Sequence, residues 1–125
     1  MMRADIANAV SIGAIGLLLA TSGVAAPAAK LSPDEIKATF FNGQPFTSST
    51  MSNVKFQMVF TPDGKMTREP VAKTGAKAEG TWKLSKEGFC TTWKGSTANC
   101  FRIETAGDNK WQVVKGTTAV GTWSK

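Results

Sequence analysis

The sequence predicts a mainly β domain, either an antiparallel meander or a small β-barrel, with one short N-terminal helix after a signal peptide. Three observations lead to this prediction. After residue 53 the chain consists of short apolar runs, and the first has a period of two, in which Phe56, Met58 and Phe60 alternate with Lys55, Gln57 and Val59. Turns rich in glycine separate these runs at short intervals. A single helix-start signal precedes them, at residues 31–36.

Residues 1–28 are typical of a secretory signal peptide. Arg3 supplies a positive charge, and residues 10–20 form an uncharged run that is too short for a membrane-spanning helix, which needs about 20 apolar residues. Ala26-Pro27-Ala28 offers a cleavage site, with a cut two or three residues earlier, or an uncleaved anchor, as alternatives. The sequence therefore predicts a signal peptide at 1–28 and a single β-rich domain at 29–125, with no stable membrane anchor after cleavage.

The mature domain is expected to open with a short helix. Ser32 and Glu35 have the spacing of a capping box, in which each side chain accepts a hydrogen bond from the other residue's backbone N–H. Leu31 and Ile36 flank this box and can pack together as a hydrophobic staple. Asn42-Gly43 is a suitable stop.

The remainder of the chain reads as strands joined by turns. Thr61-Pro62-Asp63-Gly64 is a turn, because proline fixes φ and glycine accepts a positive φ. Gly80-Thr81-Trp82 recurs as Gly121-Thr122-Trp123, which we interpret as two strands that each begin with a close backbone approach and then bury a tryptophan. A basic loop is expected at 72–79. The predicted strands are 54–60, 65–71, 81–85, 89–93, 99–105, 111–114 and 118–123.

Cys90 and Cys100 are the two cysteines of the chain and flank a turn-like segment. Export would bring them into an oxidising compartment, where a bridge across a hairpin would form. Alternation places Phe89 and Phe101 on one face of this hairpin and both cysteines on the other. A redox-active or metal-binding pair is the alternative, but the spacing is not C-x-x-C and the chain has no histidine.

Composition argues against catalysis. The absence of histidine excludes serine–histidine and cysteine–histidine nucleophile pairs as well as histidine metal sites. The carboxylates show no spacing that suggests a glycosidase pair, and the mature domain has no glycine-rich phosphate loop. Lysine, with 12 residues against 3 arginines, dominates a net charge of +6, which favours solubility and diffuse attraction to anions. We therefore expect no enzyme, no cofactor and no metal.

Four tryptophans fall in the predicted strands, and lysines lie beside several of them. Core packing is the ordinary role of such tryptophans. The alternative is that one or two line a barrel mouth and stack on a ligand. Aromatic residues with lysines can also bind single-stranded nucleic acid, but export argues against that partner. The candidate ligand-binding residues are Trp82, Trp93, Trp111, Lys83, Lys94 and Lys110.

Several short motifs carry a family resemblance. The segments LSPDEIKATFFNG at 31–43, FTPDGK at 60–65 and GTWKLSKEGFCTTW at 80–93, followed by Cys100, resemble a group of small secreted proteobacterial proteins of unknown function. The resemblance covers most of residues 31–103. It implies a lipocalin-like or related β fold and a periplasmic location, and it implies no activity.

These observations favour a non-catalytic, exported binding module that acts in the periplasm or outside the cell. Its expected partner is an anionic envelope component or a protein. The alternative function is that of a secreted inhibitor of a hydrolase, either a protease or a lysozyme. Such an inhibitor would use an exposed segment, either the loop at 72–79 or the N-terminal segment of the mature domain.

Overall fold

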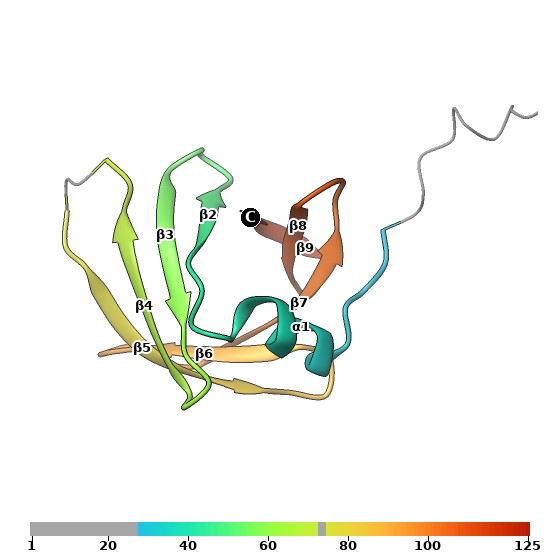
Figure 1. Ribbon diagram of the computed structural model, residues 1–125, viewed down its shortest axis with the longest axis horizontal. Helices are drawn as coiled ribbons and strands as arrows, with labels where there is room; N and C mark the ends of the chain where they lie inside the picture. The colour runs from blue at the N-terminus through green and yellow to red at the C-terminus, as the bar shows by residue number, and fades with distance from the viewer. Residues whose placement is uncertain (1–27, 73–74) are drawn as a thin grey trace, which may run out of the picture.

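The computed structural model describes residues 28–72 and 75–125, so nearly all of the predicted signal peptide lies outside the described residues. The described chain forms a closed antiparallel barrel of eight strands with one helix (Figure 1). Each strand pairs with the next along the chain, and the last strand returns to the first. The elements are α1 (Pro33–Phe40), β2 (Phe46–Thr50), β3 (Lys55–Phe60), β4 (Lys65–Pro70), β5 (Ala78–Leu84), β6 (Phe89–Trp93), β7 (Asn99–Thr105), β8 (Lys110–Lys115) and β9 (Thr118–Ser124).

The predicted mainly β fold class is confirmed. Of the two predicted forms, an open antiparallel meander and a small β-barrel, the structure has the barrel. The strand list was incomplete, because β2 (Phe46–Thr50) was not predicted. Only Phe46 of this strand is a large apolar residue, so the sequence FTSST shows no alternation. Its backbone nevertheless closes the barrel, since Ser48 lies opposite both Phe56 of β3 and Trp123 of β9.

The predicted loop at 72–79 extends two residues too far, because its last two residues belong to a strand. β5 begins at Ala78, where Ala78 and Glu79 pair with Arg68 and Thr67 of β4. Gly80 therefore lies within β5 and not at its start, as does Gly121 within β9. The close approach at Gly80 is confirmed, because an added Cβ would lie 2.5 Å from the carbonyl oxygen of Thr92.

Helix α1 lies inside the curve of the strands, on the side of the β3–β4 and β5–β6 turns (Figure 1). Its capping box is present: the Glu35 backbone N–H donates to the Ser32 hydroxyl, and the Ser32 N–H donates to the Glu35 carboxylate. The helix buries Ile36 and Phe40, and Phe41 follows directly as the C-cap residue. Its apolar face therefore closes one end of the barrel.

An aromatic cluster joins this helix to the barrel wall. The Phe41 ring stacks on Phe60 with centroids 4.6 Å apart and lies 4.4 Å from the Trp82 ring. The Phe40 ring makes edge contacts with Trp111 at 4.9 Å and with Trp123 at 5.0 Å. Ring pairs at these separations add to the stability that burial alone provides.

The residues just before α1 extend the sheet. β6 pairs with β7 only as far as the Phe89–Phe101 pair, which leaves the second half of β7 without that neighbour. The Leu31 N–H donates to the Ile103 carbonyl at 2.8 Å, and the Thr105 N–H donates to the Ala29 carbonyl at 2.9 Å. The N-terminal segment, considered above as an inhibitory segment, is thus hydrogen-bonded to β7.

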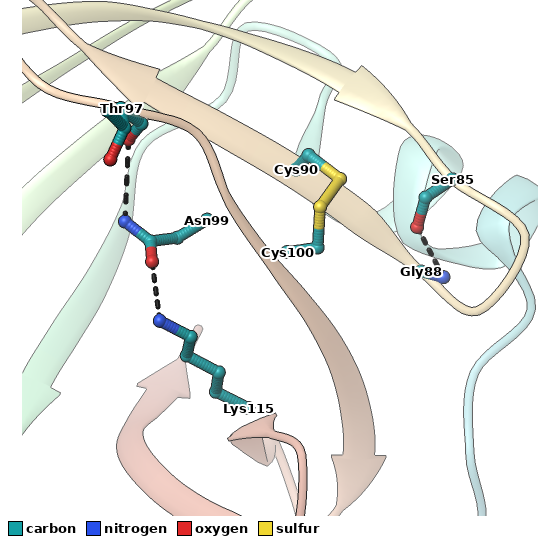
Figure 2. The surroundings of a disulfide bond; sticks show 7 residues. All are labelled: Ser85, Gly88, Cys90, Thr97, Asn99, Cys100 and Lys115. Atoms are coloured by element: carbon teal, nitrogen blue, oxygen red, sulfur yellow. Dashed lines mark hydrogen bonds between the residues drawn. A yellow bond between two sulfur atoms is a disulfide. The ribbon is translucent and has the colours of Figure 1, made fainter.

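The disulfide Cys90–Cys100 joins β6 to β7 (Figure 2). The two cysteines face each other in register, with Cα atoms 3.9 Å apart. On the opposite face of the hairpin the Phe89 and Phe101 rings lie 5.5 Å apart and pack in the core, as alternation predicted. A bridge of this kind is compatible with an oxidising extracellular compartment.

The β3–β4 turn carries a carboxylate with a lowered pKa. The hydroxyl of Thr61 donates to Asp63, and this hydrogen bond holds the pKa of Asp63 below its usual value. We expect Thr61→Val to raise the pKa of Asp63, because the carboxylate loses its principal donor. Carbon-detected NMR titration of the side-chain carboxyl would measure the shift.

The same titration contains its own control. Glu87 has a pKa lowered by Lys30, which Thr61→Val does not touch. A folded-state pKa below the unfolded one stabilises the protein above the unfolded pKa, and this stabilisation is lost as the pH falls through the folded pKa. An unchanged Asp63 pKa in the variant would show that the hydroxyl is not the cause.

Candidate functional site

A cavity of about 180 Å³ lies inside the barrel. Because α1 leads directly into the start of β2, the end of β2 at Thr50 lies at the barrel end away from the helix. Because neighbouring strands run in opposite directions, the start of β3 and the ends of β4 and β6 lie at the same end of the barrel as Thr50. The cavity opens at this end. Its wall consists of Ser48, Thr50, Phe56, Met58, Phe60, Arg68, Phe89, Thr91, Trp93, Phe101, Val113, Val120, Gly121 and Trp123.

The floor of the cavity belongs to the hydrophobic core. Phe60, Phe89 and Trp123 line the cavity and also contact Phe41, with ring centroids 4.6, 5.4 and 6.5 Å from the Phe41 ring. Phe41 and Phe60 are almost fully buried. The helix end therefore closes the bottom of the cavity with rigidly packed aromatic rings.

The mouth of the cavity holds an arginine. Arg68 shares the inward parity of the buried Met66 on β4, and its guanidinium carbon lies 4.9 Å from the Phe56 ring centroid and 4.7 Å from that of Trp93. Cation–π contacts at this range are favourable. Arg68 was not among the predicted site residues, although its alternation with Met66 along β4 is a sequence signal for an inward side chain.

Hydroxyl groups supply the other polar atoms of the wall. Ser48 and Thr50 come from β2, and Thr91 comes from β6. Thr91 is 6% exposed, and within residues 28–72 and 75–125 it is the one buried polar residue. A buried hydroxyl normally requires a hydrogen-bond partner. In the described part of the chain no side-chain hydrogen bond satisfies it, so its hydroxyl is available to a guest in the cavity.

The structure does not bring the six predicted ligand-binding residues together. Trp93 lines the cavity. Trp82 and Trp111 lie at the helix end, where Trp82 packs on Phe41 and its Nε1 donates to the Thr61 carbonyl at 2.9 Å. These two tryptophans thus serve core packing, which is the ordinary role of tryptophans in strands.

The three predicted lysines are all exposed and lie apart. Lys83 is on the outer face, opposite Cys90, and Lys110 is at the helix end, opposite Ser124. Lys94 follows Trp93 at the open end. Only Lys94 is near the cavity mouth.

Some apolar side chains are exposed around the open end. The large hydrophobic residues that the described chain exposes all lie at this end. They occupy the β2–β3 connection, the residue directly after β4 and the first half of β9, and the β2–β3 connection points away from α1 in Figure 1. Clustered exposed apolar side chains mark interaction sites more often than scattered ones do. These residues are Met51, Val54, Val71 and Val120.

Comparison with known proteins gives no match: no family model, no curated protein and no solved structure is similar to this chain. No helix in the described residues is long and apolar enough to cross a membrane. Across residues 28–72 and 75–125, no group of three or more His, Cys, Asp or Glu side chains is placed to hold a metal ion.

Proposed function

We propose that the protein is a non-catalytic binding module, exported to the periplasm or secreted, that takes a small and partly apolar ligand into the open end of its barrel. The observation that carries this proposal is the cavity with an aromatic floor and a polar mouth. Export is supported by the signal-like sequence at 1–28 and by the disulfide.

The volume of the cavity limits the size of its ligand. Apolar cavities of about 150 Å³ in other proteins hold benzene, whereas pockets for drug-sized ligands start at about 300 Å³. A cavity of about 180 Å³ thus suits a single aromatic ring or a short acyl chain. Such a guest would rest on Phe60, Phe89 and Trp123 and would displace weakly held water from apolar surface.

Filling the cavity tests this proposal. Thr91→Leu adds apolar volume inside the barrel, and Thr92→Leu makes the same chemical change on the next residue, which points to the outer face. We expect benzyl alcohol to bind the unmodified protein and Thr92→Leu with similar affinity, and to bind Thr91→Leu at least about tenfold more weakly, because the leucine occupies ligand space. Isothermal titration calorimetry on the purified, oxidised proteins would give the affinities.

The two leucine variants also define the opposing result. Equal affinity of benzyl alcohol for both would place the binding outside the barrel. No binding to the unmodified protein would remove the cavity as the site for a small neutral ring. Thermal melting of each variant, followed by near-ultraviolet circular dichroism, checks that the barrel is intact.

A further inference from the structure

Arg68 is the single charged residue in the wall of the cavity. Every other lining residue is neutral, and most of them are aromatic or aliphatic. In the described part of the chain Arg68 takes part in no ion pair, since the ion pairs there are Lys30–Glu87 and Arg102–Glu104. The mouth of the cavity therefore holds one positive charge without a protein counter-charge.

The contacts of Arg68 leave its hydrogen-bonding capacity unused. Phe56 and Trp93 contact the guanidinium through their rings, which attract the charge but do not accept strong N–H hydrogen bonds. None of its five N–H groups donates to another described residue. Arg102 shows the contrast, because it bonds to the Glu104 carboxylate and to the Gly116 carbonyl.

This arrangement suits a carboxylate. The guanidinium is planar and presents paired N–H donors that match the two oxygens of a carboxylate. Its weaker hydration, compared with an ammonium group, lowers the cost of replacing water by a ligand at a half-buried position. The single cation balances one negative charge, whereas a phosphate monoester at pH 7 carries about −1.5 to −2 and would leave an excess of buried charge.

We propose that the barrel binds a small monocarboxylate with an apolar body, an aromatic ring or a short acyl chain, whose carboxylate pairs with Arg68 at the mouth while the apolar part lies on the aromatic floor. The hydroxyls of Ser48 on β2 and Thr91 on β6 would supply further donors from the two sides of β4. The inference rests on the proposed function and adds the chemical class of the ligand to it.

A pair of isosteric probes tests the charge. Phenylacetate and phenylacetamide have nearly the same shape, but only the first is an anion. We expect the unmodified protein to bind phenylacetate about tenfold or more tightly than phenylacetamide at pH 7, because a charge-assisted hydrogen bond is about twice as strong as a neutral one. Arg68→Met should reduce this preference to about threefold or less, and its affinity for phenylacetamide should stay within about threefold.

Two further variants separate the site from general electrostatics. Lys94→Met removes an exposed positive charge at the same end of the barrel and should keep the preference for phenylacetate. Arg68→Lys keeps the cation without the paired donors and should give an intermediate preference, and it remains informative if Arg68→Met does not fold.

Different failures have different meanings. Equal binding of both probes to the unmodified protein overturns the carboxylate inference and leaves the cavity function in place. Loss of the preference in Lys94→Met to the same degree as in Arg68→Met also overturns it, in favour of diffuse attraction. Tighter binding of phenyl phosphate than of phenylacetate overturns the monoanion assignment. Absence of binding by both probes overturns the carboxylate inference and the proposed function together.

Discussion

Replacing Phe41 by alanine is expected to lower the free energy of unfolding by about 3–5 kcal/mol, the usual loss for a fully buried phenylalanine. Phe41 is 1% exposed and its ring contacts Phe60, Trp82 and Phe89, so its removal opens a void between the helix and the floor of the cavity. The total free energy of unfolding of a small domain is only about 5–15 kcal/mol. The variant should therefore unfold at a much lower urea concentration, which tryptophan fluorescence would follow.

Phe56→Ala is the matched control for this experiment. Phe56 lies at the open end and is only partly buried, so the same substitution removes fewer contacts there. Phe56→Ala should therefore lower the free energy of unfolding clearly less than Phe41→Ala does. Equal losses at the two positions would contradict the picture of a barrel that is tightly packed at the helix end and open at the other.

Removing the disulfide should give the second large effect. Cys90 and Cys100 enclose a short loop, with a sequence separation of 10, and the chain-entropy model assigns such a bridge about 2–3 kcal/mol. We expect the double variant Cys90→Ala/Cys100→Ala to melt about 10–20 °C below the oxidised protein, given the size of the domain. Differential scanning calorimetry would measure the difference.

Reduction provides an independent route to the same state. Dithiothreitol should lower the melting temperature of the unmodified protein toward that of the double alanine variant and should leave the variant unchanged. If the unmodified protein melts at the same temperature with and without reductant, the bridge does not stabilise the fold.

Much of the fold follows from local sequence patterns. The capping box at Ser32 and Glu35, the glycine-containing turns and the parity of the cysteine hairpin each depend on neighbours within a few residues, and all three are confirmed. β2 could not be predicted in this way. Its place in the barrel depends on backbone pairing with β3 and β9, and β9 lies at the far end of the chain.

The site was less accessible from sequence than the fold. Alternation shows which residues of a strand point inward, but it does not show which end of a barrel remains open. That depends on where α1 packs, and the helix turns Trp82 and Trp111 into core residues while Trp93 lines the cavity. Arg68 was overlooked because an arginine on a strand is usually solvent-exposed, although its parity with Met66 points inward.

The neighbour-to-neighbour order of the strands has a consequence for folding. Seven of the eight pairings are hairpins, which need only short loops to close, whereas the β2–β9 pairing joins residues such as Ser48 and Trp123 across most of the domain. Contacts that are distant in sequence form slowly, so we expect this seam to close last.

Until that step, β2 and β9 are the open edges of a curved sheet, and unpaired edges invite pairing between chains. The sequence FTSST of β2 is a poor template for such pairing, because four of its five side chains are small and polar and cannot form a dry interface between sheets. The polar sequence of β2 is therefore the reason that the strand was not predicted, and the same polarity protects the chain against aggregation before the barrel is complete.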